Sequence, residues 1–220
     1  MIHLTVIRFP DIRLQTRDAH KLRGYFGNLF REHSPLLHNH YEDGTFRQQY
    51  PLVQYKVLRQ VPTLVALNEG AELLNALFLH MKAVCIENRT YPVNAKHITS
   101  QHVEIGYADR LHTYRFQTLW MALNQSNFQT YRQSSVEEQA IMLEKIAVGN
   151  VLSFFKHLGL RLSAEQRLMA KLNVTAQTTQ FKNQRMLAFE GNLIVNAILP
   201  DHVGIGKAVS RGFGTLQRID

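Results

Sequence analysis

The sequence predicts an α+β protein that consists of two domains of about a hundred residues each. The chain has 220 residues, and 45% of them are hydrophobic, which is enough for a globular core. In the first half, apolar residues alternate in two-residue steps in some segments and recur at helical spacing in others. These segments are a strand at 2–9, a helix from Asp18 to about Glu32, strands at Val53–Leu58 and Thr63–Leu67, a helix at Ala71–Lys82, and a strand-like run from Ile98 to Tyr107.

Each of these elements has a local reason. Asp18 is a candidate N-cap for the first helix, whose apolar stripe contains Leu22 and Phe26. The step from Val61 to Pro62 predicts the turn between the two central strands. The resulting order β-α-β-β-α-β is that of the ferredoxin-like (RRM-like) fold with an antiparallel sheet. We therefore expect a domain boundary near Ala108, which gives domains of residues 1–108 and 109–220.

The second half predicts a similar mixture of elements, although the two halves share no residue-level repeat. Ser135 and Glu138 have the spacing of a capping box at the start of the longest helix, and Gly159 ends it. The strands expected here are Thr113–Phe116, Leu168–Ala176, Met186–Leu199 with a turn near Gly191, and a last strand at Thr215–Ile219.

The composition excludes several classes of protein. No apolar run approaches the roughly 20 residues that span a bilayer, and the strand-like start lacks the pattern of a signal peptide. Cys85 is the single cysteine, which excludes an intramolecular disulfide and a cysteine metal cluster, and we expect it to be an inert buried thiol. These features favour a cytoplasmic location and no membrane partner.

The net charge of +8 indicates a polyanionic partner, since release of counterions favours such binding. Charge alone does not distinguish RNA from DNA or from an anionic membrane.

A glycine-rich basic segment near the end of the chain is the most distinctive local pattern. Gly204–Gly214 contains the glycines Gly204, Gly206, Gly212 and Gly214 and the cations Lys207 and Arg211. Glycine permits positive φ angles and close approach of another molecule, and successive free N–H groups in such a loop suit phosphate oxygens.

Two familiar phosphate-binding loops do not fit this segment. A Walker A loop needs a glycine where the chain has Asp201, and a serine or threonine where it has Ala208. A Rossmann fingerprint needs a glycine where the chain has Val209. A nucleotide-binding enzyme is therefore disfavoured.

The pattern glycine-x-glycine, a basic spacer and glycine-aromatic-glycine resembles the signature loop of the CRISPR-associated RNA-processing endoribonucleases of the RAMP superfamily. Three other stretches agree with it: Leu22-Arg23-Gly24, Tyr50-Pro51-Leu52-Val53-Gln54-Tyr55-Lys56, and Leu193–Asp201. The resemblance covers most of the chain and implies two ferredoxin-like folds in tandem.

The resemblance also implies an activity: cleavage of CRISPR precursor RNA within its repeats by attack of a 2′-hydroxyl, without a metal or other cofactor. The products would carry a 2′,3′-cyclic phosphate and a 5′-hydroxyl. The partners would be CRISPR repeat RNA and other subunits of an effector complex, and a homodimer stays open. The alternative is a non-catalytic RAMP subunit that binds guide RNA.

Such a reaction needs proton transfer near neutral pH, for which imidazole is suited. On the resemblance, His40 is the first candidate and His38 the second, and both could instead be turn histidines that bond nearby backbone. Tyr50 and Lys56 are the candidates to assist, although Tyr50 could be a core residue and Lys56 an exposed strand cation. No spacing here matches a standard metal site.

The residues expected to bind RNA come from three parts of the chain. Arg23 lies on the first helix and could equally be a solvated cation, and Arg47 precedes the Tyr-Pro element. The others belong to the glycine-rich segment: Gly204, Gly206, Lys207, Arg211, Gly212 and Gly214. Phe213 is expected to pack beneath the loop.

Overall fold

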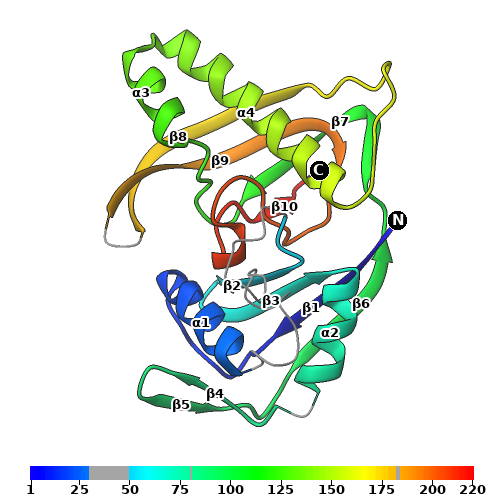
Figure 1. Ribbon diagram of the computed structural model, residues 1–220, viewed down its shortest axis with the longest axis vertical. Helices are drawn as coiled ribbons and strands as arrows, with labels where there is room; N and C mark the ends of the chain where they lie inside the picture. The colour runs from blue at the N-terminus through cyan, green and yellow to red at the C-terminus, as the bar shows by residue number, and fades with distance from the viewer. Residues whose placement is uncertain (30–49, 80, 182–183) are drawn as a thin grey trace, which may run out of the picture. The chain divides into compact units, whose positions relative to one another are not determined.

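The chain was analysed as a computed structural model, which describes residues 1–29, 50–79, 81–181 and 184–220. It divides into two compact units (Figure 1). The N-terminal unit contains Met1–Val103 together with Ser210–Gly212, and the C-terminal unit contains Glu104–Val209 and Phe213–Asp220. The division falls between Val103 and Glu104. Ala108, the predicted boundary, lies inside a strand of the C-terminal unit, Gly106–Phe116.

The N-terminal unit has the predicted β-α-β-β-α-β order. Its antiparallel sheet has the strand order β2-β3-β1-β6, with one helix after β1 and one after β3 (Figure 1). This is the ferredoxin-like arrangement. The elements are β1 Ile2–Arg8, α1 Ala19–Leu29, β2 Val53–Leu58, β3 Val61–Leu67, α2 Glu69–Phe78 and β6 His97–Val103.

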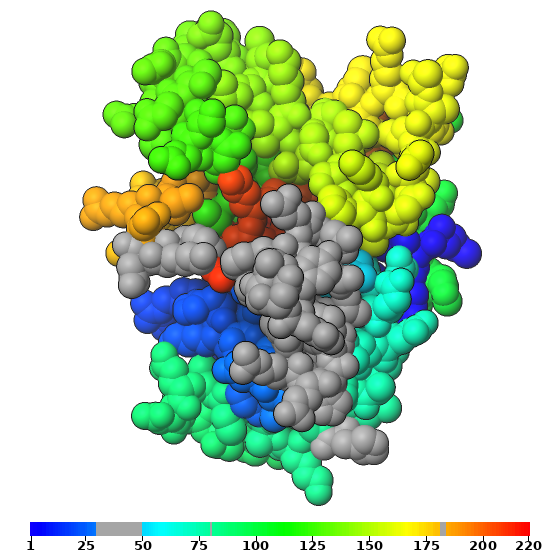
Figure 2. All heavy atoms as spheres, in the orientation of Figure 1, coloured from blue at the N-terminus to red at the C-terminus, as the bar shows by residue number. Residues whose placement is uncertain are grey.

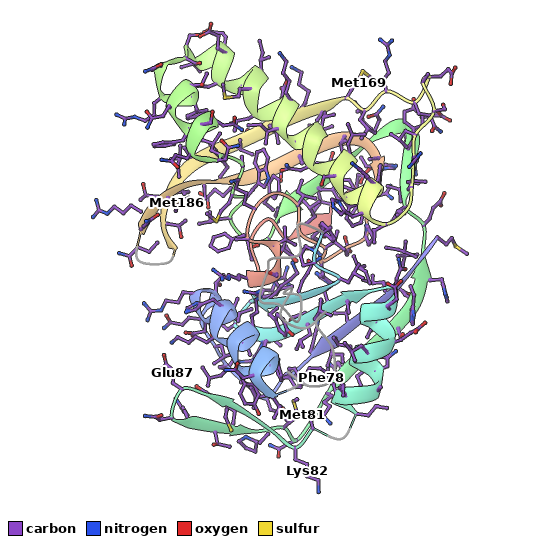
Figure 3. The ribbon with its side chains drawn as sticks, viewed as in Figure 1. Phe78, Met81, Lys82, Glu87, Met169 and Met186 are labelled. Atoms are coloured by element: carbon purple, nitrogen blue, oxygen red, sulfur yellow. The ribbon has the colours of Figure 1, made fainter. Side chains whose placement is uncertain are left out.

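The core of this unit lies between the two helices and one face of the sheet. Phe26 from α1, Leu74 from α2 and Tyr55 from β2 are fully buried there. Phe78 from α2 is fully buried there as well (Figure 3). The side chains of β2 alternate, so Val53, Tyr55 and Val57 enter this core while Gln54 and Lys56 point to the opposite face. The opposite face is buried as well, because Gln54 and Lys56 both have no exposed surface.

The turn between β2 and β3 lies two residues earlier than predicted. Arg59 and Gln60 form it, with φ angles of 50° and 67°. Val61 and Pro62 are the first residues of β3, where Pro62 is tolerated near the start of a strand. The Pro62 carbonyl accepts a hydrogen bond from Phe9 N at 3.1 Å. Two consecutive left-handed residues match the right-handed twist of the hairpin better than a turn centred on proline.

A small hairpin between α2 and β6 was not predicted. It consists of β4 Ala83–Ile86 and β5 Arg89–Pro92. Cys85 lies on it and is only partly buried, with Sγ 3.4 Å from the hydroxyl of Thr90, so the prediction of a fully buried thiol is wrong.

The C-terminal unit has the strand order β10-β7-β9-β8, which is again the ferredoxin-like order, and α3 and α4 lie on one side of this sheet (Figure 1). The glycine-rich segment, with a short 3₁₀ turn at Val209–Arg211, connects the last two strands in place of a second long helix. The elements are β7 Gly106–Phe116, α3 Gln125–Gln133, α4 Val136–His157, β8 Ala170–Phe181, β9 Gln184–Ile198 and β10 Leu216–Arg218.

The capping box at α4 is present as predicted. Glu138 N donates to Ser135 Oγ at 3.3 Å, and Ser135 N donates to Glu138 Oε2 at 2.8 Å. Gly159 follows the end of the helix with a φ of +77°, as a left-handed C-cap requires. No helix in the described ranges is long and apolar enough to cross a membrane.

Gly191 lies inside β9 and not at the turn that was predicted there. Its φ is +132°, and a Cβ atom would lie 2.1 Å from the carbonyl oxygen of Asn173 on the neighbouring strand β8. The glycine therefore allows two long strands to approach closely, which a sequence cannot distinguish from a turn signal.

Replacement of Gly191 by alanine should destabilise the protein by about 2–4 kcal/mol, because the added methyl group meets backbone that cannot move away. Gly149→Ala is the matched control: Gly149 is exposed on α4 with open space around its Cα, so alanine should stabilise the helix by up to about 1 kcal/mol. Urea unfolding of the three proteins measures both effects. Equal stability of the Gly191→Ala variant and the parent would contradict this account of the close approach.

Candidate RNA-binding site

The predicted site residues fall into three groups in the structure. The proposed catalysts His40 and His38, and Arg47, lie outside the described residues. Arg23, Tyr50, Lys56, Arg211 and Gly212 lie in the N-terminal unit, and the loop residues Gly204, Gly206, Lys207 and Gly214 lie in the C-terminal unit.

In the C-terminal unit, the base of the glycine-rich segment is bound tightly by main-chain hydrogen bonds. Ile205 N donates to the carbonyl of Gly214 at 3.0 Å, and Gly214 N donates to the carbonyl of Leu119 at 2.9 Å. Lys207 N donates to the carbonyl of Met121 at 2.9 Å. These three N–H groups are therefore used within the protein and do not form the free phosphate cradle that the composition suggested.

The glycines at this base are required by sterics. Gly206 has a φ of +90°, and a Cβ atom there would lie 2.6 Å from Nε1 of the buried Trp120. Gly214 has a φ of +64°, and its Cβ would lie 2.0 Å from the carbonyl oxygen of Ile205. Both positions thus combine a left-handed backbone with a lack of space. The side chain of Lys207 is exposed between them.

The tip of the segment, Ser210–Gly212, belongs to the N-terminal unit. Gly212 has a φ of +88°, and a Cβ there would lie 3.0 Å from the carbonyl oxygen of Tyr55 and 3.1 Å from Cβ of Ala19. The backbone of the tip therefore lies against the edge strand β2 and the first residue of α1. This contact brings Arg211 to the helix that carries Arg23.

Arg23 and Arg211 form a pair of partly buried cations. Burial lowers the pKa of Arg23, and the positive charge of Arg211 lowers it further. Burial also lowers the pKa of Arg211. Two guanidinium groups close enough to affect each other create a local positive potential that favours an anion. Arg23 is therefore not the fully solvated cation that was the alternative on sequence.

Lys56 is the most strongly perturbed cation near this tip. Its side chain has no exposed surface, and burial lowers the pKa of its amine to about 7. The alternative of an exposed strand cation is therefore excluded. A lysine with such a pKa holds its proton only marginally at neutral pH, and a nearby phosphate would favour the protonated form.

Tyr50 is held close to the same strand face. Its hydroxyl accepts a hydrogen bond of 2.8 Å from Nε2 of the buried Gln54, which points to the same side of β2 as Lys56. Tyr55 points into the core, where burial raises its pKa. Of the two tyrosines, Tyr50 is thus the one that lies on the side of Lys56.

The strand register adds a cation that the sequence analysis missed. Lys56 on β2 is opposite Thr63 on β3, and Thr63 is opposite Arg8 on β1. Directly opposite residues of neighbouring strands point to the same face, so Arg8, which is exposed, shares the face of Lys56. From the sequence, the alternation of β1 shows only that Arg8 lies on one face of that strand. The pairing of β1, β3 and β2 is needed to show that this is the face that carries Lys56.

A second feature that the sequence analysis missed is the environment of His112. Its Nδ1 lies 3.0 Å from a carboxylate oxygen of Asp220 and 2.6 Å from Nη2 of Arg218. The hydrogen bond with His112 and the charge of Arg218 hold the pKa of Asp220 well below its usual range. Since His112 is 2% exposed, this cluster links β10 to β7 and has a structural role.

The described side chains of the site are suited to an anion. In the described part of the chain, no three His, Cys, Asp or Glu side chains lie close enough together to hold a metal. The cations of the site present N–H donors that suit phosphate oxygens.

Because the pKa of Lys56 is lowered in the folded state, the unfolded chain binds more protons between about pH 7 and about pH 10.5. The free energy of unfolding should therefore rise with pH across this window, by at most about 5 kcal/mol. In Lys56→Met this rise should be lost, and the variant should be more stable than the parent below pH 7. Urea unfolding at about pH 6 and about pH 9.5 measures the difference.

Lys207→Met, at an exposed position, is the control and should keep the rise of the free energy of unfolding with pH. The same pH dependence in the parent and in Lys56→Met would contradict the buried, weakly protonated state of Lys56.

Solved structures resemble the whole chain. One, a crystal structure of Cas6b, is 32% identical, and the alignment covers 99% of both chains with a TM-score of 0.94. Another, a CRISPR RNA processing endoribonuclease Cas6b, is 30% identical over 99% of both chains with a TM-score of 0.77. A RAMP protein that binds different RNA substrates is only 8% identical and shares the fold, with a TM-score of 0.60 over all of both chains.

Sequence comparisons agree with these structures. An uncharacterized protein of Methanocaldococcus jannaschii is 30% identical over 148 residues, which cover 67% of this chain and 99% of that protein. The family model of the Cas6b N-terminal domain matches residues 1–104, and the model of the Cas6b C-terminal domain matches residues 106–219. The chain therefore belongs to the Cas6b family, a group of the RAMP-like Cas6 proteins.

Proposed function

We propose that this Cas6b chain is an endoribonuclease that cleaves CRISPR precursor RNA within its repeats. Family membership over both domains and the likeness to a CRISPR RNA processing endoribonuclease support the activity. The observation that carries the proposal in this molecule is the pair of partly buried cations Arg23 and Arg211 at the tip of the glycine-rich segment, where Gly212 lies against the strand that carries the buried Lys56.

The chemistry follows from RNA itself. The 2′-hydroxyl attacks the adjacent phosphorus in line, the 5′-oxygen of the next nucleotide departs, and the products are a 2′,3′-cyclic phosphate and a 5′-hydroxyl. The protein has to remove one proton, supply another and stabilise the negative charge that develops on the phosphorane. None of these steps needs a metal ion in this proposal.

Arg23 and Arg211 meet the third requirement. Arg23 and Arg211 can each present a planar fork of N–H donors to phosphate oxygens, and partial burial strengthens such contacts. An approaching phosphate would raise the pKa of the Lys56 amine, because the anion opposes the effect of burial. The amine would then hold its proton more strongly. Binding of the RNA backbone would thus be coupled to protonation of Lys56.

We assign the proton transfers to His40, with His38 as the second candidate; these positions rest on the resemblance to the RAMP endoribonucleases. Tyr50 would assist from the face of β2 that carries Lys56, where Gln54 fixes its hydroxyl. A chain that binds guide RNA without cutting is the alternative, and a cleavage assay separates the two.

The test is cleavage of repeat RNA by the purified protein in EDTA. We expect cleavage within the repeat, and no cleavage when the 2′-hydroxyl at the cut site is replaced by hydrogen, while binding stays within about twofold. His40→Ala should reduce the single-turnover rate by about 10²–10⁴-fold and leave affinity nearly unchanged.

His20→Ala is the matched control for the histidine variant. His20 is exposed on α1 and its Nδ1 contacts the nearby carbonyl of Arg17 at 2.6 Å, so its removal should not change the rate. Tight binding without cleavage would support the binding subunit instead. Cleavage of the deoxy substrate would exclude attack by the 2′-hydroxyl, and an unchanged rate in His40→Ala would transfer the role to His38 or another group.

The cations of the segment should dominate the salt dependence of binding. The double variant Lys207→Ala, Arg211→Ala should weaken binding and reduce the slope of log K against log salt by about 0.7 for each phosphate that the protein no longer neutralises. Fluorescence anisotropy with the deoxy substrate over a range of salt concentrations measures this slope. Arg110→Ala, at an exposed position of β7, is the control. An unaltered slope would remove the segment from the RNA interface.

A further inference from the structure

The strand β6 forms an open edge of the sheet in the N-terminal unit. Its pairing with β1 is continuous, from Arg8 opposite His97 to Ile2 opposite Val103. In the described part of the chain, no strand pairs with the other side of β6. The opposite edge of the sheet, β2, differs because the tip of the glycine-rich segment lies against it.

The usual features that keep an edge strand from pairing are missing from β6. Proteins protect such edges with proline, with lysine and other charged side chains, or with bulges. The segment His97–Val103 contains no proline, lysine, arginine or carboxylate, and its register has no shift. All of its residues up to His102 are exposed. Alternate N–H and C=O groups of β6 therefore point outward, where another extended chain could pair with them.

The helix α2 runs beside this open edge (Figure 1). Asn75 Nδ2 donates to Ser100 Oγ at 3.2 Å, and Lys96 Nζ donates to the carbonyl of Leu79 at 2.7 Å. His3 Nε2 lies 2.8 Å from the same Ser100 hydroxyl. In the space-filling view, the turquoise atoms of α2 form part of the outer surface (Figure 2). A strand added to β6 would thus lie next to the side of α2 that carries Asn75.

One end of this surface is apolar. Leu79, which follows the last residue of α2, is 58% exposed, and Ile98 is 37% exposed. Ile98 is two residues before Ser100, so both side chains point to the side of the strand that faces α2. These two exposed side chains would be covered by an apolar side chain of a bound segment.

The other end is acidic. The helix begins next to His3, because Asn68 N donates to the carbonyl of His3 at 2.8 Å, and His3 is opposite His102 on β6. Glu72 lies in the first turn of α2 and is exposed. It therefore lies at the His102 end, which is about 13 Å along the strand from Ile98. A carboxylate at this place favours a cationic side chain of the partner.

We propose that an extended segment of another protein binds along β6 as an added strand, beside α2. Its main chain pairs with the outward N–H and C=O groups of β6, and its alternate side chains face α2. Antiparallel pairing is the commoner kind, and it matches a segment with a lysine or arginine followed, four residues later, by a large aliphatic residue. The basic residue faces Glu72 and the aliphatic residue covers Leu79 and Ile98. The proposal is independent of RNA cleavage, since none of these side chains belongs to the candidate site.

The probe is a short fluorescent peptide of threonine and valine that contains one lysine and, four residues later, one leucine. Its binding to the full chain, after removal of bound nucleic acid, is measured by fluorescence anisotropy. We expect a dissociation constant of about 10–100 μM, because a single added strand forms less than a standard interface. Bound peptide should leave the rate of repeat RNA cleavage unchanged, so this test and the test of the cleavage activity can fail separately.

Variants of the protein test the two ends of the surface. Glu72→Lys should weaken binding by about tenfold, and a peptide with glutamate in place of lysine should bind this variant as tightly as the original peptide binds the parent. Ile98→Thr should weaken binding by about threefold to tenfold while it keeps a β-branched residue in the strand. The matched controls are Glu137→Lys, in the first turn of α4, and Leu111→Thr, at an exposed position of β7. Both should bind the peptide like the parent.

Methylation of the peptide nitrogens tests whether the segment is an added strand. Methyl groups on the alternate nitrogens that face β6 remove the donors and should abolish binding, whereas methyl groups on the other alternate set should be tolerated. An absence of peptide binding would overturn the proposal, as would equal binding of the two methylated peptides or parental binding by both Glu72→Lys and Ile98→Thr. Displacement of the peptide by repeat RNA would assign the surface to RNA, and displacement by self-association of the chain would assign it to a second copy. Either result would overturn the proposal as well.

Discussion

The glycine-rich segment depends on a steric constraint: its main chain takes left-handed conformations at places with no room for a side chain. Gly206 lies against Trp120, Gly214 lies against the carbonyl of Ile205, and Gly212 lies against Tyr55 and Ala19. Any side chain at these positions would push the segment away from the β-strands and the helix that it contacts. The glycines thus place the cation Arg211, and main-chain hydrogen bonds attach the base of the segment to the residues around Leu119 and Met121.

Burial is the second factor that gives this site its properties. A basic protein has many solvated cations, which bind phosphate weakly and lose much of their attraction in salt. Arg23, Lys56 and Arg211 differ because each is partly or fully removed from water, which the lowered pKa values of all three reflect. Such groups cost stability in the absence of an anion and recover it when an anion binds. Binding of a phosphate at this position is therefore favoured by the stability that the protein regains.

The sequence predicted the fold class and most elements correctly, because alternation and helical stripes are local signals. It predicted the capping box at Ser135 for the same reason. The turn at Arg59–Gln60 and the role of Gly191 were missed, since a glycine or proline signal does not say whether it serves a turn or a close approach of strands. The placement of Arg211 beside Arg23, the burial of Lys56 and the shared face with Arg8 depend on contacts between residues far apart in the chain, which periodicity does not contain. The roles assigned to His40 and His38 rest on the family resemblance alone.

The central claim is that the tip of the glycine-rich segment and α1 together grip the RNA backbone. The most direct measurement is a crystal structure of the protein with a repeat RNA that carries a deoxy nucleotide at the cut site. This account predicts a phosphate group within hydrogen-bonding distance of the guanidinium groups of both Arg23 and Arg211. A complex in which the RNA backbone passes elsewhere and both arginines keep only protein contacts would contradict it.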